Sequence, residues 1–396
     1  MHKLPISRPK LLRIIITIIG IVLMLLAMIF ANRIPLHQRV LIQGIGIDKS
    51  ENGGYDVTVQ AISTSVSASV EVYETQGDSL YEALNNITLV TGKSPFYTHN
   101  SIIIIGRECA EAGLYNVIDF FIRHHQTRPA ENMFMAADKA GDILTLKSSP
   151  EITMENEQLQ TNQYVLASQI EQLASAGDLD SQLLDVRVLD VANNLYSEHC
   201  DVVLPILSVQ EESITEEGCA VFFGDKLRGI LDRQTTVGMK AINNKLTGGA
   251  VNITLDNGDV ATLDFLESRC QIKTEIRNNI PHFTLTLSCK MGIKEINRPL
   301  HNKLSMDAFD VIGNTAAERI QSVVEQAVEA TIREYRSDVI CFSNTLWKQQ
   351  TSWWKENEKD WRTIMKQCTF SVSVDASVSE EGQEMSPVTF EPVSLF

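Results

Sequence analysis

Cysteine is scarce in this sequence, and its spacing excludes the kinds of site that cysteine usually builds. The 396 residues contain seven cysteines and no C-x-x-C pair. An odd, scattered set in a long chain is typical neither of a disulfide framework nor of a zinc site. We expect buried free thiols, although Cys270 and Cys289 flank a predicted hairpin and could form a bridge. No metal and no cofactor is predicted.

Acidic residues are absent from the first 47 positions, where the chain instead carries a long apolar run. Residues 14–31 read IIITIIGIVLMLLAMIFA and are interrupted only by Thr17 and Gly20. As a helix this run would be roughly 27 Å long, close to the roughly 30 Å hydrocarbon core of a bilayer. We therefore predict a transmembrane anchor within residues 1–38. The positions that mark the anchor along its length are Ile14, Ile18, Val22, Leu26 and Phe30.

Four basic residues between Lys3 and Arg13 precede the apolar run. The positive-inside rule then places the N-terminus in the cytoplasm and the rest of a single-pass chain outside. A cleaved secretory signal is the alternative, but such signals have shorter apolar regions and need a small-x-small pair that is missing here. A lipoprotein signal needs a cysteine directly after the run, and the first cysteine is Cys109. The uncleaved anchor is the favoured interpretation.

Basic residues are also outnumbered beyond the anchor. Six of the 34 Lys and Arg residues lie in the first 39 positions, so the rest of the chain carries 28 basic against 50 acidic residues, a net charge of −22. Such a surface repels nucleic acid and anionic lipid headgroups. We expect no nucleic-acid partner, and we expect the acidic part to lie off the membrane unless a protein partner holds it there.

Hydrophobic periodicity predicts an α+β fold in a multi-domain chain, with antiparallel or mixed sheets. A first α+β domain over residues 39–210 opens with a hairpin and continues with alternating helices and short buried strands. The segment from 148 to about 201 reads as polar and helical. The predicted elements are strands 39–48, 55–62, 101–106, 132–137 and 202–209 and helices 79–91, 108–125 and 139–146.

The rest of the chain divides into a small middle unit, residues 211–248, and a C-terminal α+β domain, residues 249–396. The middle unit holds a hairpin over 219–231 and a helix over 236–245. The C-terminal domain holds several strands and a long amphipathic helix whose apolar stripe runs from Ala316 to Val339 at spacings of three and four. We assign this stripe to the core rather than to a partner groove. The C-terminal strands are 250–255, 260–270, 272–276, 282–290 and 369–378.

One motif suggests an enzyme, because residues 77–80 read Gly-Asp-Ser-Leu, the letters of a family of serine esterases. Those enzymes need a histidine to activate the serine, normally in a D-x-x-H sequence, and none of the eight histidines here follows that spacing. Ser79 with Glu82 instead forms the S-x-x-E capping box that begins a helix. Helix capping is the favoured role, and no catalytic residue is predicted.

Other candidate motifs are weaker still. Gly44 and Gly46 lack the third glycine of a dinucleotide fingerprint and precede a turn, not a helix. His124 and His125 are adjacent and point to different faces of a helix, which disfavours joint metal ligation. His199 stands alone beside Cys200. The four tryptophans between 347 and 361 either pack the end of the long helix or mark a contact surface, and packing is favoured.

Several segments, taken in order over roughly residues 39–375, resemble the Ger(x)C family, the C subunits of germinant receptors in spore-forming bacteria. One departure lies at the anchor, where the family typically has a lipoprotein cysteine followed by Trp-Asp and this chain has Phe30-Ala-Asn-Arg33. Lipid modification is therefore not expected. The segments that carry the resemblance are 44–48, 55–60, 77–84, 99–106, 121–123, 128–129, 336–342 and 354–361.

The resemblance implies a multi-domain α+β protein on the outer face of the spore inner membrane. It implies assembly with the integral-membrane A and B subunits of a germinant receptor, and it supplies no catalytic residues. Whether this subunit contacts the small-molecule germinant directly or only through its partners stays open. Two alternatives from other classes are an extracytoplasmic GDSL-like hydrolase and a structural envelope protein.

Overall fold

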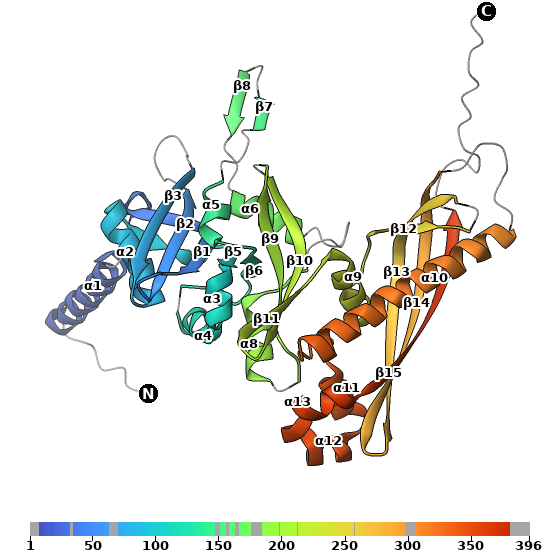
Figure 1. The fold of residues 1–396 in the computed structure, drawn as a ribbon. Coiled ribbons are helices and arrows are strands. Elements are labelled where there is room, and N and C mark those ends of the chain that lie inside the picture. Colours follow the sequence, from blue (N-terminus) through green and yellow to red (C-terminus); the bar gives the residue numbers. More distant parts are fainter. Residues whose placement is uncertain are drawn as a thin grey trace, which may run out of the picture.

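Two large β-sheets organise the elongated molecule, the first built from strands that precede Asp232 and the second from strands that follow Gly249 (Figure 1). Both sheets mix antiparallel and parallel pairs and carry helices, which confirms the α+β class. The computed structural model describes residues 8–31, 35–62, 70–124, 126–146, 151–155, 158–162, 166–175, 184–197, 199–211, 213–256, 258–297 and 306–380.

The N-terminal apolar run forms helix α1 (Arg8–Ala31), which lies at one end of the molecule (Figure 1). Its described side chains are exposed, with 43–55% of Ile14, Ile18, Val22 and Leu26 accessible. The side chain of Phe30 lies outside the described residues. Across the described part of the chain, no helix reaches the combination of length and apolar character that crossing a membrane requires.

The first sheet has the strand order β11-β10-β9-β6-β5-β1-β2-β3, with β4 paired to β1. Its centre is parallel and buried on both faces, as the four fully buried isoleucines of β5 show. The predicted first hairpin is present as β1 and β2. The strands are β1 (Arg39–Lys49), β2 (Tyr55–Ile62), β3 (Val70–Gly77), β4 (Ser94–Phe96), β5 (Ile102–Ile105), β6 (Asn132–Ala136), β9 (Val203–Gln210), β10 (Ser213–Phe223) and β11 (Lys226–Leu231).

The helices around this sheet are shorter than the sequence pattern predicts. The predicted helix 108–125 is broken at Gly113, where φ is 129° and the next amide, Leu114 N, donates to Asp225 O on the β10–β11 turn. The predicted helical segment 148–201 contains a β7–β8 hairpin before its helices. The elements are α2 (Leu80–Thr91), α3 (Arg107–Ala112), α4 (Tyr115–Arg123), α5 (Ala140–Leu144), β7 (Glu151–Glu155), β8 (Gln158–Asn162), α6 (Leu166–Ser175) and α8 (Val188–Tyr196), with single turns η1 (Leu36–Gln38) and η2 (Tyr97–His99).

Residues 213–231 extend the first sheet, because β10 pairs with β9 along its length and β11 pairs with β10. Hydrogen bonding therefore continues across the predicted boundary at residue 210. Helix α9 (Arg233–Ile242) follows and lies between the two sheets (Figure 1). The boundaries of the middle unit stay a prediction.

The second sheet has the order β12-β13-β14-β15 and is crossed by a long helix (Figure 1). The predicted strands 260–270 and 272–276 are in fact one strand, because β13 pairs with β14 through a tight turn at Asn278 and Asn279, both with positive φ. β15 returns parallel to β14. The bounds are β12 (Ala250–Thr254), β13 (Val260–Arg277), β14 (Ile280–Asn297) and β15 (Thr369–Glu380).

Helix α10 (Met306–Val328) packs its apolar stripe on this sheet, with Ala316, Ile320 and Val324 buried, so the assignment of the stripe to the core is confirmed. The helix begins before the predicted stripe and ends before its last residue, since a π-helical segment, η3 (Glu329–Glu334), follows it and the chain then leaves helical geometry before Val339. The remaining elements are α11 (Phe342–Gln349), α12 (Thr351–Asn357), η4 (Glu358–Asp360), α13 (Trp361–Ile364) and η5 (Met365–Gln367).

The tryptophans divide between the two predicted roles. Trp354 and Trp361 are buried and meet edge to face with ring centroids 5.7 Å apart. Trp347 is 46% exposed and stacks on His199. Packing is therefore the role of Trp354 and Trp361, whereas Trp347 presents much of its ring to the surface.

Candidate functional site

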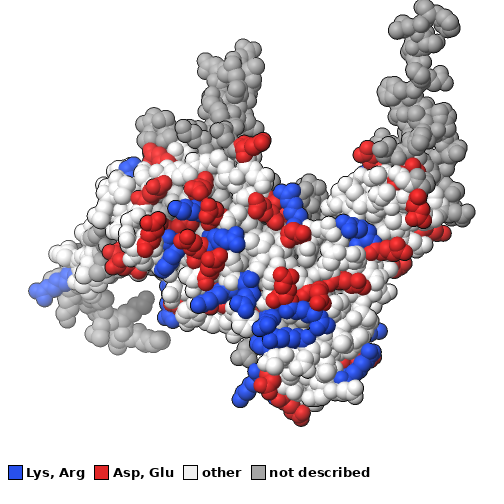
Figure 2. Space-filling view, in the orientation of Figure 1, with Lys and Arg blue, Asp and Glu red and all other residues white. Residues whose placement is uncertain are grey.

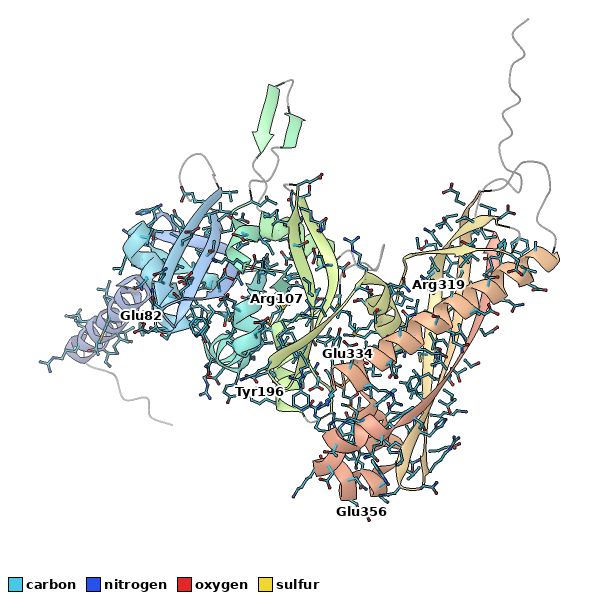
Figure 3. The ribbon with its side chains drawn as sticks, in the orientation of Figure 1. Glu82, Arg107, Tyr196, Arg319, Glu334 and Glu356 are labelled. Atoms are coloured by element: carbon cyan, nitrogen blue, oxygen red, sulfur yellow. A yellow bond between two sulfur atoms is a disulfide. The ribbon has the colours of Figure 1, made fainter. Side chains whose placement is uncertain are left out.

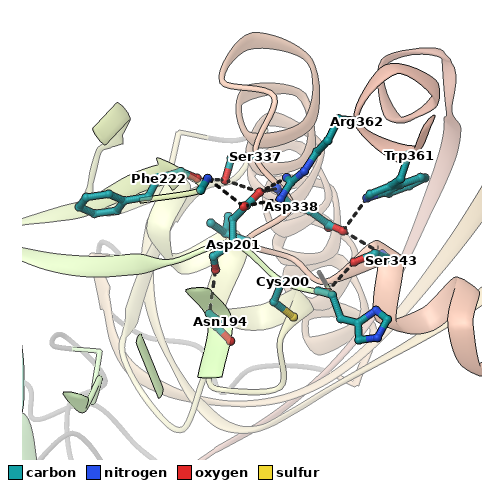
Figure 4. A network of polar contacts seen from close by, with 12 residues as sticks. Asn194, Cys200, Asp201, Phe222, Ser337, Asp338, Ser343, Trp361 and Arg362 are labelled. Atoms are coloured by element: carbon teal, nitrogen blue, oxygen red, sulfur yellow. Dashed lines mark hydrogen bonds and ion pairs between the residues drawn. The ribbon is translucent and has the colours of Figure 1, made fainter. Parts of the chain in front are cut away.

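A buried polar cluster joins the two halves of the molecule, which we call the first unit (the first sheet with its helices) and the second unit (the second sheet with its helices). Asp201 is the centre of this cluster (Figure 4). Asp201 lies just before β9, and its side chain is only 2% exposed. Arg362, on α13, donates to this carboxylate from both terminal guanidinium nitrogens, Nη1 and Nη2, with Nη2 2.7 Å from Asp201 Oδ1. Bidentate pairs of this kind are among the strongest hydrogen-bonded ion pairs in proteins. One strand of the first unit is thereby held to a helix of the second.

The same carboxylate accepts further hydrogen bonds from both units. Asp338 N donates to Asp201 Oδ2 over 2.6 Å. Ser337 Oγ lies 3.3 Å from the same oxygen, but its single proton is directed to Phe222 O, 2.5 Å away. Gly224 N, on the β10–β11 turn, donates to Asp201 Oδ1 over 3.3 Å. A buried charge is tolerated when its lone pairs are used in this way. We call the group of Asp201, Ser337, Asp338, Ser343, Trp361 and Arg362 the junction cluster.

Asp338 is the second carboxylate of the junction cluster, and its side chain is wholly buried. It accepts from Phe342 N over 2.7 Å and from Ser343 N over 2.8 Å, at the start of α11. Trp361 Nε1 donates to it over 3.2 Å. Loss of hydration raises the pKa of Asp338 to about 6, although the hydrogen bonds from Ser343 and Phe342 oppose the rise.

A disulfide between Cys200 and Cys341 lies beside the junction cluster and closes a separation of 141 residues. The expectation of free thiols is therefore wrong for these two cysteines. The suggested Cys270–Cys289 bridge is also wrong, since both thiols are free and buried on neighbouring strands. The error has a physical reason: a cross-link between distant segments depends on tertiary proximity, which spacing along the chain does not report.

Ser79 lies where the capping interpretation predicts. Glu82 N donates to Ser79 Oγ over 3.2 Å, and the Glu82 carboxylate accepts from Asp78 N over 3.1 Å. Ser79 also lines a surface cavity of about 440 Å³ together with His124. His124 stacks on Phe120 with ring centroids 5.1 Å apart. The cavity brings the two side chains to one place, while the Ser79 hydroxyl is used to cap α2.

The glycines of β1 serve packing. A Cβ on Gly44 would come within 2.9 Å of Ala167 Cβ, and one on Gly46 within 3.2 Å of Ala140. Helices α5 and α6 therefore approach this strand closely. Asp48, at the end of the same strand, accepts from the amides of Ala140 over 2.8 Å and Gly141 over 2.9 Å. Strand β1 thus contacts the start of helix α5 of its own chain. In a dinucleotide-binding site, phosphate groups would occupy that position.

The remaining predicted sites stay apart. His199 packs against Trp347 and Trp354, while His125 lies outside the described residues. Within the described ranges, no three His, Cys, Asp or Glu side chains are grouped so as to hold a metal ion. On the face shown in Figure 2, acidic and basic side chains are interspersed over both sheet units.

Sequence reasoning missed Asp201 and Arg362, because a single aspartate and a single arginine 161 positions apart carry no spacing signal. The segments 336–342 and 354–361 were singled out, and both contribute to the junction cluster through Asp338 and Trp361. Those two segments were the only sequence signal that pointed to the cluster. Their partner in the first unit, Asp201, could be found only from the fold.

Comparison with known proteins gives matches on both sides of the junction. The family model described as "Spore germination protein N-terminal domain" matches residues 32–209. The model described as "Spore germination B3/ GerAC like, C-terminal" matches residues 217–382. The two matches cover most of the chain, and the junction cluster takes residues from each.

Individual relatives agree with the family models. The chain is 21% identical to spore germination protein B3 of Bacillus subtilis (strain 168), over 88% of this chain and 92% of the relative. It is 20% identical to spore germination protein KC of the same organism, over 93% and 96%. The crystal structure of the GerBC protein matches with a TM-score of 0.58 at 18% identity, covering 85% of this chain and 96% of that one, which shows a shared fold.

Proposed function

We propose that this chain, which belongs to the Ger(x)C family of spore germination proteins, acts as the C subunit of a germinant receptor. The observation that carries the proposal is the match of the N-terminal and C-terminal family models, in order, over most of the chain. The fold shared with the GerBC protein supports it. In this role the protein takes part in nutrient-triggered germination of the spore.

The subunit is non-catalytic in this proposal. Ser79, the serine of the Gly-Asp-Ser-Leu motif, is used as a helix cap. The junction cluster and the Cys200–Cys341 disulfide instead make a firm connection between two units. Such a connection suits a protein that holds partners in a fixed arrangement.

The proposal places the chain at the spore inner membrane, anchored by α1 with its N-terminus in the cytoplasm and its bulk on the outer face. The apolar run 14–31 and the basic residues before it support the anchor. The disulfide supports the outer location, because disulfides persist in oxidising compartments. The integral-membrane A and B subunits of the receptor are its proposed partners.

Deletion of the gene, followed by germination assays with single nutrients, tests this function. Loss of one nutrient response, with the others intact and the lost response restored by the wild-type gene, is the expected result. Unchanged germination with every nutrient would refute the receptor role. Purification of the tagged chain from spore membranes should bring down two multi-spanning proteins, and a variant lacking residues 1–31 should reach the soluble fraction.

The cavity that holds Ser79 and His124 is the one observation that favours a second candidate, an extracytoplasmic hydrolase. Hydrolysis of a small chromogenic ester by the purified chain, compared between wild type and Ser79→Ala, separates the two. The receptor proposal expects the same background rate from both proteins. A rate that falls at least a hundredfold in Ser79→Ala would favour the hydrolase.

A further inference from the structure

A second cavity, of about 330 Å³, lies between the two helices that flank the second sheet. Helix α9 forms one wall and α10 the other, and β12 and β13 form the floor. We call it the α9–α10 cavity. Its lining includes Val237, Leu246, Phe265, Ile320 and Val324, so the interior is apolar. Its volume falls within the range of sites that take small ligands.

The two helices that form the cavity walls approach each other closely beside it. At Gly238 the helices are so close that a Cβ would lie 2.6 Å from Val323 O and 3.0 Å from Ala327 Cβ. Beyond this contact the lining side chains Ala241 and Ala250 are too small to fill the space between the helices. Phe265, Ile320 and Val324 are each at most 5% exposed, so this apolar part of the lining belongs to the core and holds its shape.

Two guanidinium groups line the cavity. Arg319, labelled on α10 in Figure 3, donates from Nη2 to Gln234 Oε1 on α9 over 2.9 Å. Arg233, at the start of α9, donates from Nε to the backbone oxygen Glu216 O over 2.6 Å. Within the described residues, no carboxylate lies within ion-pair distance of either arginine. A guanidinium group has five N–H donors, so each side chain keeps donors that the hydrogen bond described above does not use.

This arrangement is unusual for a chain with 50 acidic and 34 basic residues, because the cavity lining contains two arginines and no aspartate or glutamate. Burial raises the pKa of the nearby Glu216 carboxyl to about 7, against the positive charges of Lys240 and Arg233, which lower it. The rim thus offers positive charge above an apolar interior. An anionic head with an apolar body complements it.

We propose that the α9–α10 cavity binds a small apolar monocarboxylate, with the hydrocarbon part in the cavity and the carboxylate on Arg319 and Arg233. The cavity lining contains no carboxylate that could pair with an α-ammonium group, so the cavity selects simple carboxylates over the corresponding amino acids. The binding site is independent of the proposed receptor role, since it rests on α9, α10 and the second sheet alone.

Ligand-observed NMR with the full chain in lipid nanodiscs tests the site, using 3-phenylpropionate as the probe. Matched probes are 3-phenylpropanol, which has the same body without charge, and phenylalanine, which adds an ammonium group. Empty nanodiscs measure partition into lipid. We expect 3-phenylpropionate to bind about tenfold or more tightly than either matched probe, because a charge-assisted hydrogen bond contributes about that much affinity.

Four variants locate the binding. Arg319→Gln should weaken 3-phenylpropionate about tenfold, and Arg228→Gln, an exposed arginine on β11, should leave it unchanged. Gln234→Leu removes the bond between the helices but keeps the guanidinium, and it should retain binding. Val237→Phe, at a partly buried position, fills the cavity and should abolish binding.

Equal binding of the acid and the alcohol, or an unchanged affinity in Arg319→Gln, would overturn the proposal. Absence of binding by 3-phenylpropionate to the wild-type chain would overturn it too. If Val237→Phe does not fold, the comparison of Arg319→Gln with Arg228→Gln still decides. Loss of binding in both arginine variants would point to a general charge effect and count against the site.

Discussion

Removal of Arg362 from the junction cluster should destabilise the chain by about 2–3 kcal/mol. Breaking a fully buried ion pair typically costs about 3–5 kcal/mol, because the remaining charge is left without its partner. Two features of this site lower that figure. The Arg362 side chain is 35% exposed and so already partly hydrated, and Asp201 keeps two backbone donors, Asp338 N and Gly224 N.

The variant is Arg362→Gln, and the measurement is urea unfolding followed by tryptophan fluorescence. Trp361 donates to Asp338 within the same cluster, so its emission reports on the junction itself. The matched control is Arg277→Gln, which breaks an ion pair with Glu275 whose side chains are 57% and 65% exposed. That control should change the free energy of unfolding by less than about 1 kcal/mol.

A double-mutant cycle with Asp201→Asn separates the pair from the rest of the cluster. We expect the double variant to be less destabilised than the sum of the two single variants by about 1–2 kcal/mol, since each single change leaves one unpaired group. A coupling energy near zero, or an Arg362→Gln variant as stable as the Arg277→Gln control, would refute the account of the junction given above.

Three further predictions concern single features of the first unit and the junction. Ser79→Ala should cost about 1 kcal/mol of unfolding free energy, measured by urea denaturation, because α2 loses its side-chain cap; Ser79→Asp should retain most of it. Cys341→Ser should cost about 2–5 kcal/mol under oxidising conditions and nothing further under reduction, since both states then lack the cross-link to Cys200. The folded-state pKa of Asp338, about 6, lies above its ordinary value of 3.8, so its contribution to stability is fully present below about pH 4 and is lost as the pH rises through 6. The difference in unfolding free energy between wild type and Asp338→Asn should therefore change by about 3 kcal/mol over that pH window. A difference that does not depend on pH would contradict the burial argument.

Local features of the fold followed from the sequence because each rests on neighbouring residues. The β1–β2 hairpin needs only two alternating runs and a turn, and the Ser79 cap needs only a serine and a glutamate three positions apart. The stripe on α10 is likewise a repeat within one segment. Periodicity reports such features directly.

The features that the sequence did not predict are those that join distant segments. The junction pair spans 161 positions and the disulfide 141, and neither partner carries a local signature. The α9–α10 cavity depends on Gly238 meeting Val323, a contact between two helices that the sequence places in different units. Even the break at Gly113 is accompanied by a contact with Asp225 on the distant β10–β11 turn. Each depends on tertiary placement, which a single sequence does not encode in any short window.

The junction also bears on how the two ends of the molecule can influence one another. Helix α1 lies at the far end of the first unit, and the α9–α10 cavity lies beside the second sheet (Figure 1). Any effect of a ligand in the cavity on the proposed membrane partners must pass through contacts between the units, and the junction cluster supplies charged, buried ones. A buried polar cluster tolerates few alternative arrangements of its side chains. The junction cluster therefore transmits a displacement of one unit to the other as a rigid-body movement or does not transmit it. Arg362→Gln should therefore leave 3-phenylpropionate binding intact while weakening germination in spores, and a variant that loses both would show that the cavity itself depends on the junction.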